Sequence, residues 1–218
     1  MSSAKEKANQ IRCISNHKQL VLAWSVYKDE NSGRLIVNDP WGGTNYPSWV
    51  YGNMLLSQDA TNAILVRSGL LYPLAPNVGV YHCPSDKSIS LRSYSMQPQL
   101  GSYQNGQPYN GQAAYGMPGY PTMYTESQMR IPAPAATIVF VDESTATLND
   151  GWFFVSATGD TWYDVPASRH SRGCNFSFAD GHAEHWRWMD PRTPSATYQS
   201  STPNNPDKRR LQAAIDTN

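Results

Sequence analysis

The sequence shows no excess of charge of either sign. In its 218 residues, 17 lysines and arginines balance 17 aspartates and glutamates, and no basic run is interleaved with aromatic residues. A net positive field is what draws a protein to nucleic acid or to an anionic membrane surface. Neither is therefore an expected partner.

Long apolar runs and several common catalytic motifs are also missing. No apolar stretch reaches the length of about 18 residues that spans a bilayer. The sequence contains no GxSxG, GxxxxGK, GxGxxG or HExxH, which are motifs of serine hydrolases, P-loop enzymes, dinucleotide-binding enzymes and zinc proteases. We expect no cofactor to be required and favour a protein that is not an enzyme.

Cysteine is scarce. Cys13, Cys83 and Cys174 form no CxxC pair, which disfavours a zinc ribbon or a thioredoxin-like site. If the protein is exported, we expect Cys13 and Cys83 to form a disulfide that ties the first helix to the sheet. Such a bond closes a loop of about 70 residues and contributes a few kcal/mol to stability.

The sequence is rich in aromatic and turn-forming residues. It carries 13 tyrosines, seven tryptophans and five phenylalanines beside 15 glycines and 16 prolines. This mixture is typical of short strands, frequent turns and long ordered loops. The length is that of one domain whose core needs no disulfide or metal to form.

The first segment predicts a helix. From Ala4 to about Glu30, large or apolar residues recur at spacings of four and three, so one face is buried and the basic residues lie mostly on the other. Asn31 and Gly33 supply the turn chemistry that ends a helix. The predicted buried face is formed by Cys13, His17, Leu20, Trp24 and Tyr27, widened by Ile14 and Val21.

Apolar, β-branched runs later in the chain predict antiparallel strands. Residues 136 to 144, ATIVFVDES, form the clearest strand. The run GWFFVSA follows the turn LNDG and is its expected antiparallel neighbour.

A hairpin is expected at Asp180-Gly181, because Asp-Gly is typical of two-residue hairpin turns. Pairing about a two-residue turn places Phe176, Phe178 and Ala183 on one face, which we assign to the core. The other, solvated face then carries Asn175, Ser177, His182 and Glu184.

The remaining segments predict loops and short helices. Residues 39 to 56 read as an ordered loop with a short strand or helix, and ATNAILVRSGLLYPL as a short helix that ends near Gly69. Residues 97 to 124 predict a long ordered loop. The expected organisation is α+β, with a helix over residues 1–30, loops and an antiparallel sheet over 31–188, and a tail over 189–218 in which DKRRLQAAI forms a terminal helical turn or two.

Several segments, taken in order and spacing, resemble one family. They are RCISNHKQLVLAWSVYKDENSGRL, GLLYPLAPNVGVYHCPSD, LRSYSM, VFVDES, NDGWF and, last, His170 followed after nine residues by Asp180-Gly181. Over nearly its whole length, the chain resembles type IV pilin-like proteins of the prepilin-type H-X9-DG family. It is more distantly similar to the pseudopilins of type II secretion.

The resemblance implies a pilin-like fold, in which a long amphipathic helix lies on a small antiparallel sheet. It implies an exported, non-enzymatic subunit at the cell surface or in the periplasm, with copies of itself and related subunits as partners. Such proteins begin with a leader and an apolar, membrane-embedded half-helix. The start MSSAKEKANQIRC enters a charged helix without a cap, so we expect this anchoring segment to be missing.

Metal binding is one candidate chemistry. Histidine and carboxylate side chains gather around the expected hairpin, where His170 could fold over a strand face. The resemblance to major pseudopilins also implies calcium in acidic loops. The preferred alternative is architectural, with His170 fixing its loop against the Asp180-Gly181 turn. The candidate metal ligands are Asp142, Asp150, His170, Asp180 and His182, with Glu143, Glu184 and His185 as further donors.

Carbohydrate binding is the other candidate. Exposed aromatic faces offer apolar area at low entropic cost, and paired carboxylates act as acid and base in glycoside hydrolysis. The alternative is that the tryptophans lie in the core, because a small sheet buries tryptophan first. The candidate sugar platforms are Trp41, Trp49, Trp152, Trp162, Trp186 and Trp188, and the candidate hydrolase carboxylates are Asp142, Glu143, Asp180 and Glu184.

Overall fold

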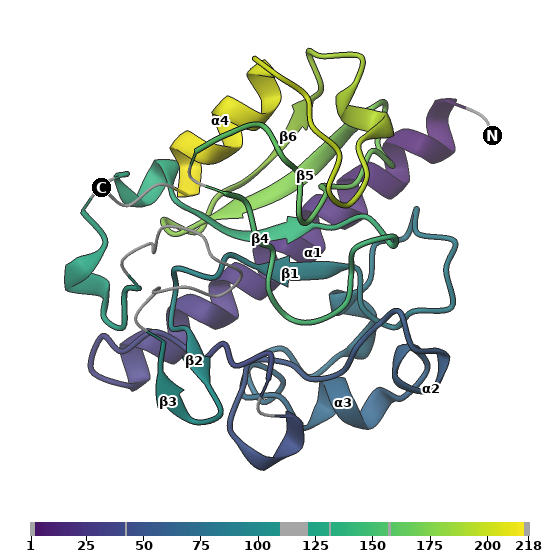
Figure 1. The fold of residues 1–218 in the computed structure, drawn as a ribbon. Coiled ribbons are helices and arrows are strands. Elements are labelled where there is room, and N and C mark those ends of the chain that lie inside the picture. The colour runs from purple at the N-terminus through teal and green to yellow at the C-terminus, as the bar shows by residue number, and fades with distance from the viewer. Residues whose placement is uncertain (1–2, 42, 110–121, 131, 157, 216–218) are drawn as a thin grey trace.

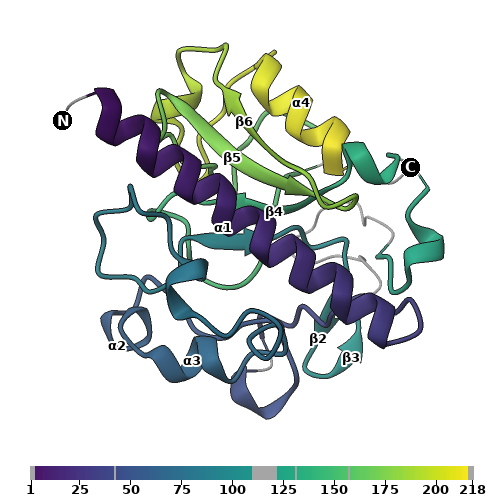
Figure 2. The same ribbon diagram turned by 180° about the vertical axis from the view of Figure 1, so that it is seen from behind.

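A long helix lies across one face of a four-stranded antiparallel sheet (Figures 1 and 2). The computed structural model describes residues 3–41, 43–109, 122–130, 132–156 and 158–215. The helix is α1, Ser3–Glu30, and the strand order is β1-β4-β5-β6. The predicted α+β class, with a long first helix and a small antiparallel sheet, is confirmed. The strands are β1, Tyr94–Met96; β4, Ile138–Asp142; β5, Gly173–Phe178; and β6, Ala183–Arg187.

The other elements are short. A separate hairpin pairs β2, Tyr103–Gln104, with β3, Gln107–Pro108. In the described part of the chain, the further α-helices are α2, Ser57–Ala60; α3, Ala63–Arg67; and α4, Pro206–Ile215. Short 3-10 helices span Gly43–Asn45, Val78–Tyr81, Glu126–Gln128, Pro134–Ala136 and Thr193–Ser195.

The helix α1 buries one stripe of side chains and ends where the sequence predicts. Residues four and three apart lie above one another on a helix, so they share the face that meets the sheet. Gly33, at φ 78°, donates its backbone N–H to the Lys28 carbonyl at 2.8 Å, which closes the helix end. The fully buried stripe contains Cys13, His17, Leu20, Val21 and Trp24.

Apolar side chains fill both faces of the sheet. On one face, Leu20 and Trp24 of α1 lie in a core that includes Phe140 of β4. On the other face, α4 contributes Leu211 and Ile215 to a second core (Figure 1). All six residues of β5 are buried as a result. The second core also contains Val141, Phe153, Trp162, Phe176, Phe178 and Trp186.

The β5–β6 hairpin reverses at Asp180-Gly181, but not through the predicted two-residue turn. Phe178 exchanges hydrogen bonds across a three-residue loop, accepting from Gly181 N–H and donating to the His182 carbonyl, both at 2.9 Å. Gly181 takes φ 93°, the left-handed position that ends a three-residue hairpin loop. The added residue shifts the strand pairing by one.

That shift corrects the predicted strand faces. Ala183 pairs with Ser177 and Glu184 with Phe176, so Ala183 is not on the face of the phenylalanines. The face of β5 that carries Asn175 and Ser177 is fully buried and turned toward α1. The prediction that it is solvated is therefore wrong, because the helix covers it.

The predicted pairing of GWFFVSA with the 136 to 144 strand is also wrong. The neighbours of β4 are β1 and β5, and β1 falls within LRSYSM, for which no strand is predicted. Trp152 instead makes an isolated parallel bridge to Met96 on the outer edge of β1. Both edges of β4 are already occupied, so residues 151–153 lie against β1 instead.

The predictions of a short helix near Gly69 and of helical turns near the chain end are confirmed. The helix expected near Gly69 is α3, and the helical turns expected in DKRRLQAAI are α4. The helix α4 packs against the body of the protein, because Leu211 and Ile215 are buried in the second core. Of the predicted loop over residues 97–124, the part from 110 to 121 lies outside the described residues.

Two leucines two positions apart on α1 test the one-sided burial. Leu20 is fully buried and Leu22 is 56% exposed. We expect Leu20→Ala to lower the free energy of unfolding by about 2–5 kcal/mol, because it leaves a cavity. The same change at Leu22 is expected to alter it by less than about 0.5 kcal/mol. Urea unfolding measures both, and equal losses would contradict this docking of α1.

Candidate functional site

An aromatic pocket opens beside the outer edge of β1. Its volume is about 320 Å³, the size that suits a small ligand. Its walls include Trp41 and Leu55, several residues between 146 and 154, and the Tyr163-Asp164 pair together with Tyr198. The aromatic lining is Trp41, Trp152, Phe154, Tyr163 and Tyr198, and the polar lining includes Thr147, Asn149, Asp150 and Asp164.

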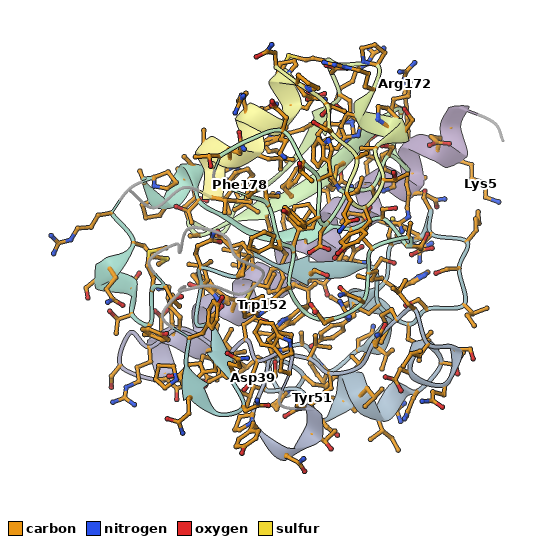
Figure 3. The ribbon with its side chains drawn as sticks, viewed as in Figure 1. Lys5, Asp39, Tyr51, Trp152, Arg172 and Phe178 are labelled. Carbon is orange, nitrogen blue, oxygen red and sulfur yellow. The ribbon has the colours of Figure 1, made fainter. Side chains whose placement is uncertain are left out.

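The segment 151–153 is held to the sheet by backbone hydrogen bonds. Met96 donates its N–H to the Gly151 carbonyl and accepts from Phe153 N–H, both at 2.9 Å. The indole N–H of Trp152 donates to the Asn38 carbonyl at 3.0 Å, and Figure 3 shows its side chain near Asp39. The ring of Trp41 meets that of Trp152 edge to face, with centroids 4.5 Å apart. The aromatic wall is therefore fixed in place.

Two carboxyl groups line the pocket and a third lies close behind it. Asp150 accepts the Trp152 backbone N–H at 2.7 Å, and Asp164 accepts that of Phe154 at 2.6 Å. Burial raises the pKa of both, and for Asp164 the charges of Glu143 and Asp150 raise the pKa further. Burial also raises the pKa of Glu143, to about 8. Carboxyl groups with perturbed pKa values in a cleft are a common feature of binding and catalytic sites.

The structure separates the six predicted sugar platforms. Trp41 and Trp152 line the pocket. The rings of the other four are buried in the cores, so they form no exposed row. These four are Trp49, Trp162, Trp186 and Trp188.

The predicted hydrolase carboxylates do not form a pair in one cleft. Asp142 and Glu143 are both fully buried, and as neighbours at a strand end they point to opposite faces. Asp180 pairs with His182 at 2.6 Å at the hairpin turn, and Glu184 pairs with Arg210 at 3.5 Å. The carboxyl groups that do share a cleft are Asp150 and Asp164, and Asp164 is not among the predicted site residues.

The predicted metal ligands lie in three separate places. Asp150 is in the aromatic pocket, and Asp180 and His182 form an exposed pair at the hairpin turn. His170 lies at the other end of β5, about 20 Å away at 3.3 Å per residue. The prediction that His170 fixes its loop against the Asp180-Gly181 turn is therefore wrong.

His170 and Asp142 instead lie in a buried cluster with two cysteines. One possible ligand atom from each of Cys13, Cys83, Asp142 and His170 lies within 4.8 Å of the others. The Cys83 sulfur is 3.2 Å from Nε2 of His170. The three cysteines are free thiols, so the predicted Cys13–Cys83 disulfide is absent, although the two residues meet as expected.

Charged and polar neighbours surround this cluster. Arg169 forms ion pairs with Asp142 and, at 3.0 Å, with Asp86. Burial raises the pKa of Asp142 to about 6, against the opposing effect of Arg169. Burial lowers the pKa of His170 to about 4. The group is polar and buried, which is an unusual content for a protein core.

Replacing Asp164 tests the buried carboxyl groups of the pocket. Because its pKa is raised in the folded state, the folded protein binds this proton more tightly than the unfolded chain does. The resulting stability is present below about pH 4 and is lost as the pH rises. We expect Asp164→Asn, which resembles the protonated form, to unfold at a higher urea concentration than the unmodified protein at pH 8, with no difference near pH 4.

Exposed Glu30 provides the control. Urea midpoints of Glu30→Gln should follow those of the unmodified protein at every pH. A midpoint for Asp164→Asn below that of the unmodified protein at pH 8 would show that the ionised carboxylate stabilises the fold.

Among the described residues, no helix combines the length and apolar character needed to cross a membrane. Comparison of the chain with protein-family models, with curated proteins and with solved structures finds no match. Support for a function therefore comes from the exposed faces, the pocket and the buried cluster of the chain itself.

Proposed function

We propose that this chain is a non-enzymatic, pilin-like subunit that assembles with copies of itself and with related subunits through the outward face of α1. The observation that carries the proposal is the set of large aliphatic side chains on that face. Ile11 is 67% exposed, Leu22 56% and Val26 43%. Contiguous exposed apolar surface marks interaction sites, and Leu22 and Val26 are neighbours one turn apart on this face.

A groove beside the helix offers a complementary surface. A cavity of about 300 Å³ opens between Leu22 and Val26 of α1 and the segment that runs from Leu74 to Val80. Ile11 lies 11 residues before Leu22, which is about 16 Å along the helix axis. The exposed side chain of Ile11 and the apolar groove thus lie at different positions along the helix axis, on the same face.

That offset favours a head-to-tail contact. If Ile11 of one copy enters the groove of the next, the contact joins two different surfaces, so it can repeat without closing. Contacts of this kind generate helical filaments. The proposal includes the location that the sequence resemblance implies, at the cell surface or in the periplasm.

Charge placed on this face should prevent assembly. We expect the unmodified chain to show a mass that rises with concentration in light scattering, and Ile11→Asp and Leu22→Asp to abolish that rise, because burying an unpaired carboxylate is unfavourable. Ile64, which is 64% exposed on α3, provides the matched control Ile64→Asp, which should associate like the unmodified chain. Association that persists in both α1 variants would contradict the proposal.

The aromatic pocket supports a second candidate, polysaccharide binding. Its flat side chains can stack on the apolar faces of sugar rings, and Asp150 and Asp164 can accept hydrogen bonds from hydroxyl groups. The lining residues described for the pocket include none from α1, so a glycan could bind while α1 is engaged in assembly.

Binding to insoluble polysaccharides tests this candidate. We expect Trp41→Ala and Tyr198→Ala to weaken binding about tenfold each, since each removes a stacking surface. Tyr46, which is 40% exposed outside the pocket, gives the control Tyr46→Ala, which should bind normally. Release of reducing sugar that Asp150→Asn or Asp164→Asn abolishes would instead identify a hydrolase, and equal binding by all variants would exclude the pocket as the site.

A further inference from the structure

We propose that Cys13, Cys83, Asp142 and His170 form a structural zinc site that fastens α1 to the sheet. The four residues come from four separate parts of the fold. Cys13 lies on α1, Cys83 follows the 3-10 helix Val78–Tyr81, Asp142 ends β4 and His170 precedes β5. The inference does not depend on the proposed assembly or on glycan binding.

The spacing of the donor atoms suits tetrahedral coordination. Nε2 of His170 lies 3.2 Å from the Cys83 sulfur and 3.8 Å from Oδ2 of Asp142, and the Cys13 sulfur lies 3.8 Å from the same oxygen. Zinc bonds of about 2.0 Å to nitrogen or oxygen and 2.3 Å to sulfur imply donor separations of about 3.3–3.8 Å. Since no two of the four donor atoms are more than 4.8 Å apart, side-chain rotations suffice to close them around an ion.

The donor set selects the metal. Two thiolates, one imidazole and one carboxylate are ligands that zinc accepts, whereas calcium and magnesium take oxygen ligands almost alone. All four residues are buried, and four protein ligands leave no position for water or substrate. A closed site of this kind stabilises a fold and does not catalyse a reaction.

Neighbouring groups suit a bound divalent ion. Two thiolates balance the charge of the ion, and Arg169 pairs with Oδ1 of Asp142, which leaves Oδ2 to face the cluster. Arg169 also pairs with Asp86, which His82 approaches to 4.0 Å. The hydroxyl of Tyr94 lies 3.2 Å from the Cys13 sulfur, so it can donate a hydrogen bond that orients this ligand, as partners of metal ligands commonly do.

The third cysteine gives a matched control. Cys174 is also fully buried and close to the cluster, but its sulfur lies 3.0 Å from the Asp142 carbonyl oxygen and is not among the four donors. A zinc site therefore predicts different outcomes for the same substitution at Cys83 and at Cys174.

Elemental analysis of the whole chain tests the proposal. The protein is produced in zinc-containing medium, reduced, and dialysed against metal-free buffer. We expect about one zinc per chain in the unmodified protein and in Cys174→Ser, and a loss of more than about tenfold in Cys83→Ser and His170→Ala. Zinc retained equally by Cys83→Ser, or none bound when zinc is added to the reduced unmodified protein, would overturn the proposal.

Cobalt provides a readout that does not depend on the folding of a variant. After removal of zinc with a chelator, Co²⁺ added to the unmodified chain should give visible bands of tetrahedral coordination and a near-ultraviolet thiolate-to-metal band. Mass spectrometry without reductant distinguishes the competing arrangement. A Cys13–Cys83 disulfide in a chain that, once reduced, gives no cobalt spectrum would show that these cysteines serve as a covalent link instead.

Discussion

The burial of one face of α1 against the sheet is the constraint on which the rest of the structure depends. The strands are short, and Leu20, Val21 and Trp24 supply the helix side of the core between helix and sheet. The same stripe carries Cys13 and His17 into the interior. For Cys13 the polar partners are Tyr94 and Asp142. The ring of His17 packs against that of Tyr94, with centroids 4.4 Å apart, and its two nitrogens have no hydrogen-bond partner among the described residues.

The parts of the fold that could be predicted from the sequence are those with local causes. The stripe on α1 follows from helical periodicity, and the helix end follows from the freedom of Gly33 to adopt positive φ. The β-branched run of β4 likewise predicts a strand. The pairing of the hairpin was not accessible in this way, because Asp-Gly suits both a two-residue and a three-residue turn. The choice between them moves Glu184 from one face to the other.

The pocket and the cluster depend on contacts that the sequence does not display. GWFFVSA has the composition of a strand, but its position is set by Met96 and by the Asn38 carbonyl that accepts the Trp152 indole N–H. Tryptophan content alone could not separate the two rings of the pocket from the four in the cores. Asp142 and His170 could be predicted as metal-ligand candidates from their residue types. Their association with Cys13 and Cys83 could not, because it requires four separate segments to meet and produces no ligand spacing in the sequence.

The two ends of α1 are held to the body of the protein by different interactions, and this affects how the helix can be used. Near the first end, Cys13 lies in the buried cluster; near the last, Lys28 pairs with Glu126 at 2.8 Å. These residues are 15 positions apart, about 22 Å along the axis. A helix fixed at both points presents Leu22 and Val26 between them on a rigid surface, so a contact made there loses little conformational entropy. The lining residues described for the aromatic pocket include none from α1, so a ligand bound there and a contact made on the helix use separate surfaces.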